Sequence, residues 1–212
     1  MTEQTTAGRV NQKLRTRTAI VQAAAELSRT GREVTMPEIA KTALVSEATA
    51  YRYFPDLASL LREAIAGQLP TPAEALAKVA GSTDPVERVA AATDFLLRHV
   101  LARQGVVRAM IAATVTRPAE AEARPNLRFG LIDHALAPLA ETLDPAGLAA
   151  LEQLHRGLAV VVSAEALFNL TDLYRLDPES AIAAVVATAT TLTRAFVQEN
   201  AASGRPAAAS AH

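Results

Sequence analysis

Start and stop signals for short helices crowd the segment from Thr35 to Asp56, and they constrain the fold more than any other feature of the chain. Thr35-Met-Pro-Glu38 is typical of a capping box, in which two side chains bond to the free N–H groups that open a helix and proline occupies the first turn. Ser46 and Asp56 are N-cap residues of the same kind, and Pro55 separates the helices that they open. The spacing predicts short helices over 36–43, over 46–53 and from Asp56 to Gly67.

The rest of the chain also predicts helices. Alanine is abundant, apolar residues recur at intervals of three and four, and no alternating strand of useful length is present. Three further helices each start at an Asp-Pro pair, at Asp84, Asp144 and Asp177. The expected helices outside the capped segment cover 11–29, 73–80, 84–103, 105–116, 126–143, 145–175 and 178–200. We therefore expect an all-α fold.

Pro70-Thr-Pro72 lies between the short helices and the long ones, and it predicts a domain junction. We expect a three-helix, helix-turn-helix domain over 1–67, followed by a helical ligand-binding and dimerisation domain over 68–212. The first ten residues and the small, polar residues 201–212 are expected to be disordered, and 118–125 to form a polar connection.

Composition excludes several classes of protein. The chain has no cysteine, so disulfides and thiol chemistry are excluded. Residues 1–15 lack the apolar stretch of a secretory signal, and no apolar run approaches the ~20 residues that span a bilayer, so we expect a soluble, cytoplasmic protein without membrane contact. There is no H-E-x-x-H motif, glycine-rich phosphate loop or G-x-S-x-G, and the histidines lack ligand-like spacing. We expect neither an enzyme nor a cofactor or bound metal.

The net charge of −1 conceals an uneven distribution of charge. Residues 1–32 carry six basic and two acidic side chains, for +4, whereas residues 68–212 carry twelve basic and fifteen acidic ones, for −3. A basic head on a mildly acidic body suggests that a polyanion is bound by the head. The alternative is a basic, solvated tail without a binding role.

Two short helices joined by a turn of three to four residues form a helix-turn-helix, whose second helix fits the ~12 Å major groove of DNA. With Ile39, Ala40 and Ala50 facing inward, the second helix presents outward-facing polar groups to double-stranded DNA. Hydroxyls suit phosphate oxygens, and the basic residues of the first helix suit phosphates or the minor groove. The candidate DNA-binding residues from this pattern are Lys13, Arg15, Arg17, Thr35, Ser46, Glu47, Thr49, Tyr51 and Arg52. The alternative is a helical hairpin whose tyrosines only pack.

The segments AIVQAAAELSRTG and VTMPEIAKTALVSEATAYRYFPDLASLL resemble the DNA-binding head of the TetR family of bacterial repressors. The resemblance covers residues ~15–65. It implies phosphate contacts by Thr35, Thr49 and Tyr51, and base reading near Glu47, Ala48 and Tyr53. It further implies that the remaining helices form an effector-binding body.

Two positions depart from the family pattern. The turn position that usually holds glycine is Leu44, which must adopt a positive φ or reshape the turn. The lysine usual at the start of the fourth helix is Leu57, which removes a phosphate contact.

Operators of helix-turn-helix proteins are usually two half-sites read by a symmetric dimer, so we expect a homodimer on an inverted repeat. The last two long helices are the candidates for its interface, and the resemblance implies a four-helix bundle. The candidate residues are Leu151, Leu158, Val162, Val185, Leu192 and Phe196. The alternative is that these side chains serve only the core of one chain.

Polar residues within apolar helices are candidates for contact with an unidentified small-molecule effector. They are Asp94, His99, Arg103, His134, Glu165 and Asn169. Glu165 stands out because an ionised carboxylate is rarely buried without a partner. Taken together, the sequence predicts a repressor, nucleoid-associated when bound to DNA, with a helical protein-binding adaptor as the alternative.

Overall fold

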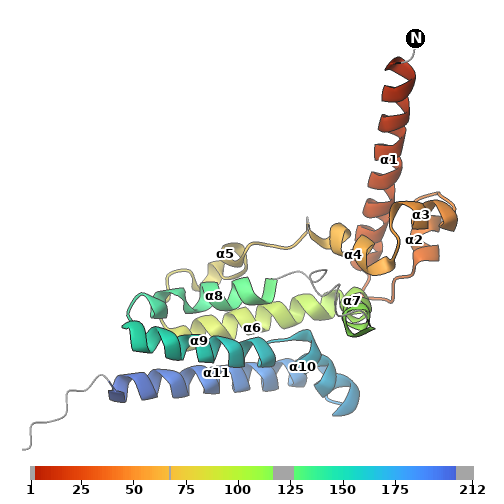
Figure 1. Ribbon diagram of the computed structural model, residues 1–212. Coiled ribbons are helices and arrows are strands. Elements are labelled where there is room, and N and C mark those ends of the chain that lie inside the picture. The colour runs from red at the N-terminus through yellow and green to blue at the C-terminus, as the bar shows by residue number, and fades with distance from the viewer. Residues whose placement is uncertain (1–2, 67, 117–126, 204–212) are drawn as a thin grey trace, which may run out of the picture. The chain divides into compact units, whose positions relative to one another are not determined.

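The computed structural model describes residues 3–66, 68–116 and 127–203, and over these residues the fold is helical without strands, as predicted (Figure 1). The chain forms two compact units. The first comprises residues 1–69 and 100–125, and the second comprises 70–99 and 126–212. The predicted connection over 118–125 lies outside the described residues.

The first unit contains α1 (Glu3–Ser28), α2 (Met36–Thr42), α3 (Glu47–Tyr53), α4 (Leu57–Ala66) and α7 (Gln104–Thr116). Ile20, Ile39, Ala50 and Leu61 are fully buried at its centre, where α1 to α4 meet. Val106 of α7 belongs to the same core and is also fully buried. Helix α7, which the sequence assigned to the effector-binding body, thus shares the core of the helix-turn-helix.

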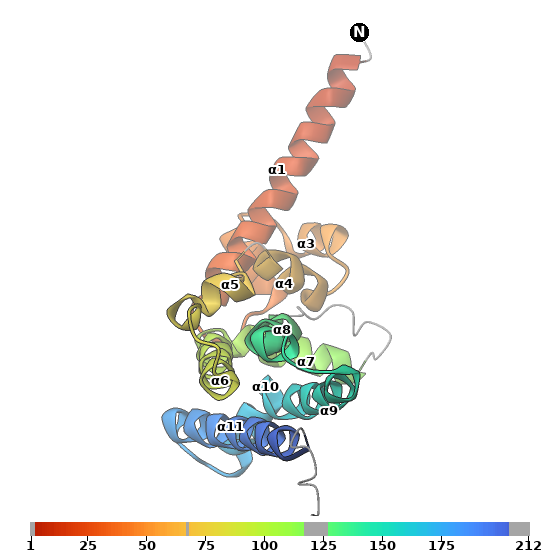
Figure 2. The same ribbon diagram turned by 90° about the vertical axis from the view of Figure 1, so that its left-hand side faces the viewer.

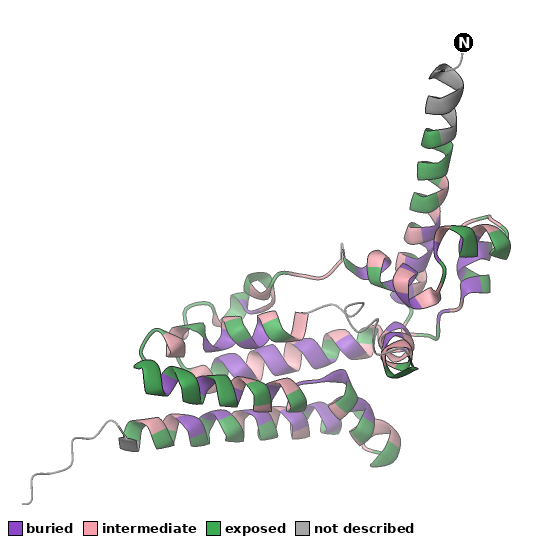
Figure 3. Cartoon of the chain, viewed as in Figure 1, coloured by how far each residue is buried: buried purple, intermediate pink, exposed green. Residues whose placement is uncertain are grey.

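Helix α1 begins at Glu3, eight residues before the predicted start, and its first half extends beyond the other helices of the unit (Figure 3). No proline interrupts residues 3–11, and extending a helix from a packed half costs little once the helix is nucleated. Leu14 lies in this part of α1 and is 61% exposed, since no other helix among the described residues of the unit covers it.

The predicted caps of the short helices are confirmed. Thr35 and Glu38 form a complete capping box, and the Ser46 hydroxyl accepts from the N–H of Thr49. The Asp56 carboxylate accepts from the N–H of Ser59 at 2.8 Å. Leu44, in the turn between α2 and α3, adopts φ +57°, the positive value expected for a position that glycine usually fills.

The second unit contains α5 (Pro72–Ala75), the short 3₁₀ segment η1 (Ala77–Val79), most of α6 (Pro85–Ala102), α8 (Leu127–Ala140), α9 (Pro145–Val161), α10 (Ala164–Phe168), the π-helical segment η3 (Asn169–Leu173) and α11 (Pro178–Ser203). Figure 2 shows α6 and α8 of this unit nearly end-on, with α9 and α11 inclined to the line of sight beside them. Leu97, Leu131, Leu158 and Ala189 are fully buried among them.

Two of the predicted helices are interrupted. The helix expected over 145–175 breaks at Val162 and Ser163, because Ser163 adopts an extended conformation and its hydroxyl accepts from the N–H of Ala166 to start α10. The helix expected over 73–80 is divided into α5 and η1 at Leu76, whose side chain is buried.

By length and composition alone, α11 passes as a membrane span over Pro178–Ala201, with a mean hydropathy of 1.5. It is the one such helix among the described residues. Its apolar character comes largely from alanine and valine, and core helices of water-soluble proteins meet the same criterion, so this is weak evidence for membrane insertion.

Candidate nucleic-acid interface

Helix α3 turns one face into the core and the other to solvent. Ala50 is fully buried against α2, which fixes the rotation of the helix about its axis. The opposite face is exposed and carries residues of the predicted DNA-binding set, namely Ser46, Glu47, Ala48, Tyr51 and Arg52. A helix that binds in the major groove of DNA needs such an exposed face, because its side chains contact the base edges.

Three predicted hydroxyls are engaged in caps at the helix starts. The Thr35 hydroxyl donates to the Glu38 carboxylate at 2.9 Å. The Ser46 and Thr49 hydroxyls are 2.9 Å apart and bonded to each other. Thr35 and Thr49 are half-buried, so each keeps part of its surface open to a neighbouring phosphate.

The two tyrosines of α3 differ in environment. Tyr51 is 49% exposed, whereas Tyr53 is half-buried and packs against the core of the first unit. The Arg52 guanidinium lies over the Tyr53 ring, 5.7 Å from its centroid. Tyr51 is therefore the more accessible of the two side chains, and the Tyr53 ring contacts Arg52 in addition to packing against the core.

The basic residues of α1 divide into two groups. Lys13 and Arg15 are exposed on the projecting half of the helix. Arg17 instead forms a two-pronged ion pair with Glu63 of α4 and lies over the Phe54 ring, 4.9 Å from its centroid. Arg17 thus links α1 to α4, and a phosphate has to compete with Glu63 for it.

Five of the six candidate interface residues of α9 and α11 lie inside the second unit: Leu151, Leu158, Val162, Val185 and Phe196 are all less than 9% exposed. Leu192 is the exception, at 37%. The five pack within one chain, so any dimer through these helices has to use their outer faces. On the outer face of α11 lie small side chains, among them Ala187, Thr191 and Ala195.

The six candidate effector residues are not brought together. His99 stacks on Phe95 of α6, with centroids 6.0 Å apart. Arg103 lies in the first unit, where burial and the nearby Arg29 lower its pKa. His134 is half-buried on α8, and Asn169 is exposed at the start of η3.

Glu165 is not buried, contrary to the reason for selecting it. Its side chain, in the first turn of α10, is 43% exposed, and its carboxylate lies 3.9 Å from the guanidinium of Arg128 on α8 of the same chain. The apolar run around Glu165 in the sequence suggested burial, but the helix restarts at Ser163 and places Glu165 on the exposed side of α10.

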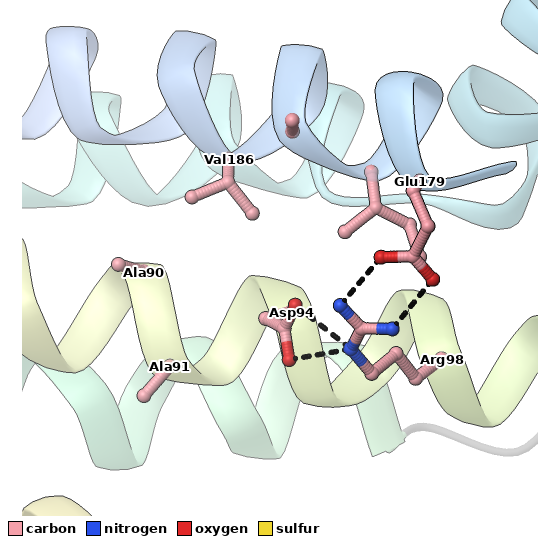
Figure 4. A pocket seen from close by; sticks show the side chains of 8 residues that line it. Ala90, Ala91, Asp94, Arg98, Glu179 and Val186 are labelled. Carbon is pink, nitrogen blue, oxygen red and sulfur yellow. Dashed lines mark hydrogen bonds and ion pairs between the residues drawn. The ribbon is translucent and has the colours of Figure 1, made fainter. Parts of the chain in front are cut away.

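The remaining candidate, Asp94, lines a groove between α6 and α11 (Figure 4). Arg98 bridges two carboxylates there, with its Nε 3.0 Å from Asp94 and its two Nη atoms 2.8 and 2.9 Å from Glu179. Sequence reasoning missed Arg98 and Glu179, although the spacing of Asp94 and Arg98 by one helical turn is a typical ion-pair signal.

Comparison with known proteins gives two matches. Residues 20–64 match the family described as bacterial regulatory proteins, tetR family. The fold is similar to the crystal structure of a TetR transcriptional regulator from Rhodococcus sp. RHA1, with a TM-score of 0.52 and 23% identity over 85% of this chain and 97% of the other. Among curated proteins, none matches the sequence significantly.

Proposed function

We propose that this chain, a TetR-family transcriptional regulator by its matched residues 20–64 and its fold, is a repressor that binds an inverted-repeat operator as a homodimer. The exposed face of α3 carries the proposal: Glu47, Tyr51 and Arg52 project from a helix whose other side is anchored by Ala50. Such a face suits the major groove, with Glu47 toward base edges and Tyr51 toward a phosphate.

The first half of α1 adds an electrostatic contribution. Lys13 and Arg15 are exposed on this half, so they are available to neutralise phosphates and release counterions. Leu57 at the start of α4 supplies no such contact. Affinity for DNA is therefore expected to fall steeply as salt rises, which a protein-binding adaptor does not require.

The homodimer is proposed to form through the outer faces of α9 and α11. On α11 the hydroxyls of Thr188 and Thr191 donate to carbonyls of their own helix, at 2.9 and 2.7 Å, so neither needs a partner from outside. Together with Ala187 and Ala195 they form a smooth face on which a second helix can approach closely. The buried candidates, such as Leu158 and Val185, support this face from inside.

A small-molecule effector is proposed to control operator binding by favouring one of two dimer conformations. The shift it produces is limited by its difference in affinity for the two. As a repressor without catalytic function, the protein acts in the cytoplasm and associates with the nucleoid when it is bound to DNA.

Selection of bound duplexes from a random DNA pool tests the proposal. Enrichment of an inverted repeat with half-sites about one helical turn apart supports it. Enrichment of no sequence, or of a single half-site only, contradicts it.

The dimer has a test of its own in Ala187→Glu, which places a charge on the outer face of α11, with Ala77→Glu on the exposed surface of η1 as control. Light scattering is expected to show a monomer for the first variant and a dimer for the second. Dimers of both variants would rule out this interface.

A further inference from the structure

The groove between α6 and α11 has the dimensions of a small-molecule site. Its volume is about 410 Å³, within the range that ligand pockets occupy. All the residues that line it belong to the second unit. The side chains of several lining residues, including Ala90 and Ala91 of α6 and Ala183 of α11, are too small to fill the space between the two helices.

The groove is apolar along most of its length. Ile182, which is only 2% exposed, and Val186 lie beside the alanines on the α11 side. Figure 4 shows Ala90, Ala91 and Val186 together, away from the charged groups. An aromatic or aliphatic group placed here leaves water without losing any hydrogen bond.

The other part of the groove carries charge. Asp94, Arg98 and Glu179 contribute a formal −1, and Asp177 stands two residues before Glu179. The pKa of Glu179 lies below its usual value because Arg98 donates to it, and the pKa of Asp177 is lowered by its hydrogen bonds from Ser180. Both carboxyl groups are therefore ionised at neutral pH.

Recognition at this end favours a donor over an acceptor. Arg98 directs its Nε and both Nη atoms at the two carboxylates, so its charge is already neutralised by them. Each carboxylate still has lone pairs to offer, since an ionised carboxyl accepts about four hydrogen bonds. An ammonium group gains from this arrangement and a carboxylate is repelled.

We propose that this groove binds small organic amines that combine one positive charge with an apolar tail, and that such amines are the effector class of the regulator. The ammonium lies against Asp94 and Glu179, and the tail lies along Val186 and the alanines. The effector role rests on the function proposed above, whereas the binding itself does not.

Two probes of equal length and opposite charge test the binding: 4-phenylbutylamine and 4-phenylbutyrate. Titration of the full-length protein, with alanine methyl groups labelled for NMR, is expected to shift the Ala90, Ala91 and Ala183 signals with the amine only. Equal binding of the two probes, or shifts confined to alanines outside the groove, overturns the proposal.

Two sets of variants test separately where the ammonium group and the apolar tail of the amine bind. Asp94→Asn with Glu179→Gln is expected to weaken amine binding about tenfold, since both partners of the ammonium lose their charge. Glu152→Gln, an exposed carboxylate on α9 paired with Arg156, is the matched control and leaves affinity unchanged. Ala183→Trp fills the groove and abolishes binding; retained affinity in this variant places the amine elsewhere and refutes the site.

Operator binding separates the effector role from the regulator function. The protein without amine is expected to bind the selected operator, and saturating 4-phenylbutylamine is expected to change that affinity at least fivefold. If the affinity for the operator is the same with and without bound amine, the effector role alone is refuted. Absence of operator binding without any amine refutes the proposed regulator instead.

Discussion

Arg88 donates to the backbone carbonyl that Pro138 leaves without a helical partner. Pro138 lies inside α8 and has no N–H to bond the carbonyl of His134, four residues earlier. The Nη2 atom of Arg88 lies 2.7 Å from this oxygen, and its Nε lies 3.0 Å from the carbonyl of Ala135. A buried arginine thus completes the hydrogen bonding of a helix interrupted by proline.

Replacing this arginine is expected to destabilise the second unit severely. Arg88 is 3% exposed and also donates to the carbonyls of Val79 and Ser82. Arg88→Met fills similar space but removes one donor from each of four carbonyls, of which only that of Val79 is shown to keep another, the N–H of Ser82. We therefore expect a loss of about 3–5 kcal/mol in the free energy of unfolding. Urea denaturation followed by circular dichroism measures it.

Pro138→Ala provides the matching control. The new N–H can bond the His134 carbonyl, so the double variant is expected to lose about 1 kcal/mol less than the sum of the single changes. Strict additivity would mean that Arg88 does not compensate for the proline.

Gly105 and Gly157 are expected to respond oppositely to alanine. A Cβ on Gly105 of α7 would lie 1.8 Å from the Arg32 carbonyl oxygen, a backbone atom that can move only with its loop. Gly105→Ala should destabilise the first unit by about 2–3 kcal/mol. A Cβ on Gly157 of α9 meets nothing within 4 Å, so Gly157→Ala should stabilise by about 1 kcal/mol. Thermal denaturation compares the two, and equal shifts would contradict the close approach of α7 to residue 32.

Leu44→Gly is expected to stabilise the protein. Leu44 is 93% exposed and holds φ +57°, so glycine relieves strain of about 1 kcal/mol without giving up any packing. Leu44→Ala loses the same side chain but keeps the Cβ, so it should show no gain. A higher melting temperature in both variants would point to the exposed apolar surface, and not the backbone, as the cause.

Local signals in the sequence predicted the local structure well. Thr35, Ser46 and Asp56 cap the helices assigned to them, because these caps depend on neighbouring residues. The positive φ of Leu44 is one of the two outcomes that the family pattern left open. The break at Ser163 was missed since serine inside an apolar run suits a helix interior and a cap about equally, and packing selects between them.

Features that depend on tertiary packing were harder to predict from the sequence. Periodicity identifies an apolar face but not what covers it, so Leu158 and Val185 could be core or interface residues by sequence alone, and the structure places them in the core. The α6–α11 groove joins Asp94 to Glu179, 85 positions apart, and no local pattern connects them.

Tyr51→Phe is expected to weaken operator binding about tenfold, by a similar factor on related sequences. The change removes a hydroxyl that we assign to a phosphate and leaves the ring in place. Tyr174→Phe, at a tyrosine that is 77% exposed in the second unit, is the control and should bind as the unchanged protein does. Fluorescence anisotropy with labelled duplexes provides the affinities. Unaltered affinity of the Tyr51 variant would exclude this phosphate contact.

Glu47→Gln is expected to change which operator is preferred. Glu47 is exposed in the first turn of α3, where a carboxylate can accept from the amino group of cytosine but an amide can also pair with adenine. Loss of a negative charge near phosphates should raise affinity for all DNA, so the ranking of sequences, and not the affinity itself, tests base reading. Competition among operators that differ at one base pair per half-site should show a change of about fivefold or more in relative affinity. Glu141→Gln, an exposed carboxylate beyond the end of α8, should leave the ranking intact, and the same ranking in both variants would remove Glu47 from the base-reading set.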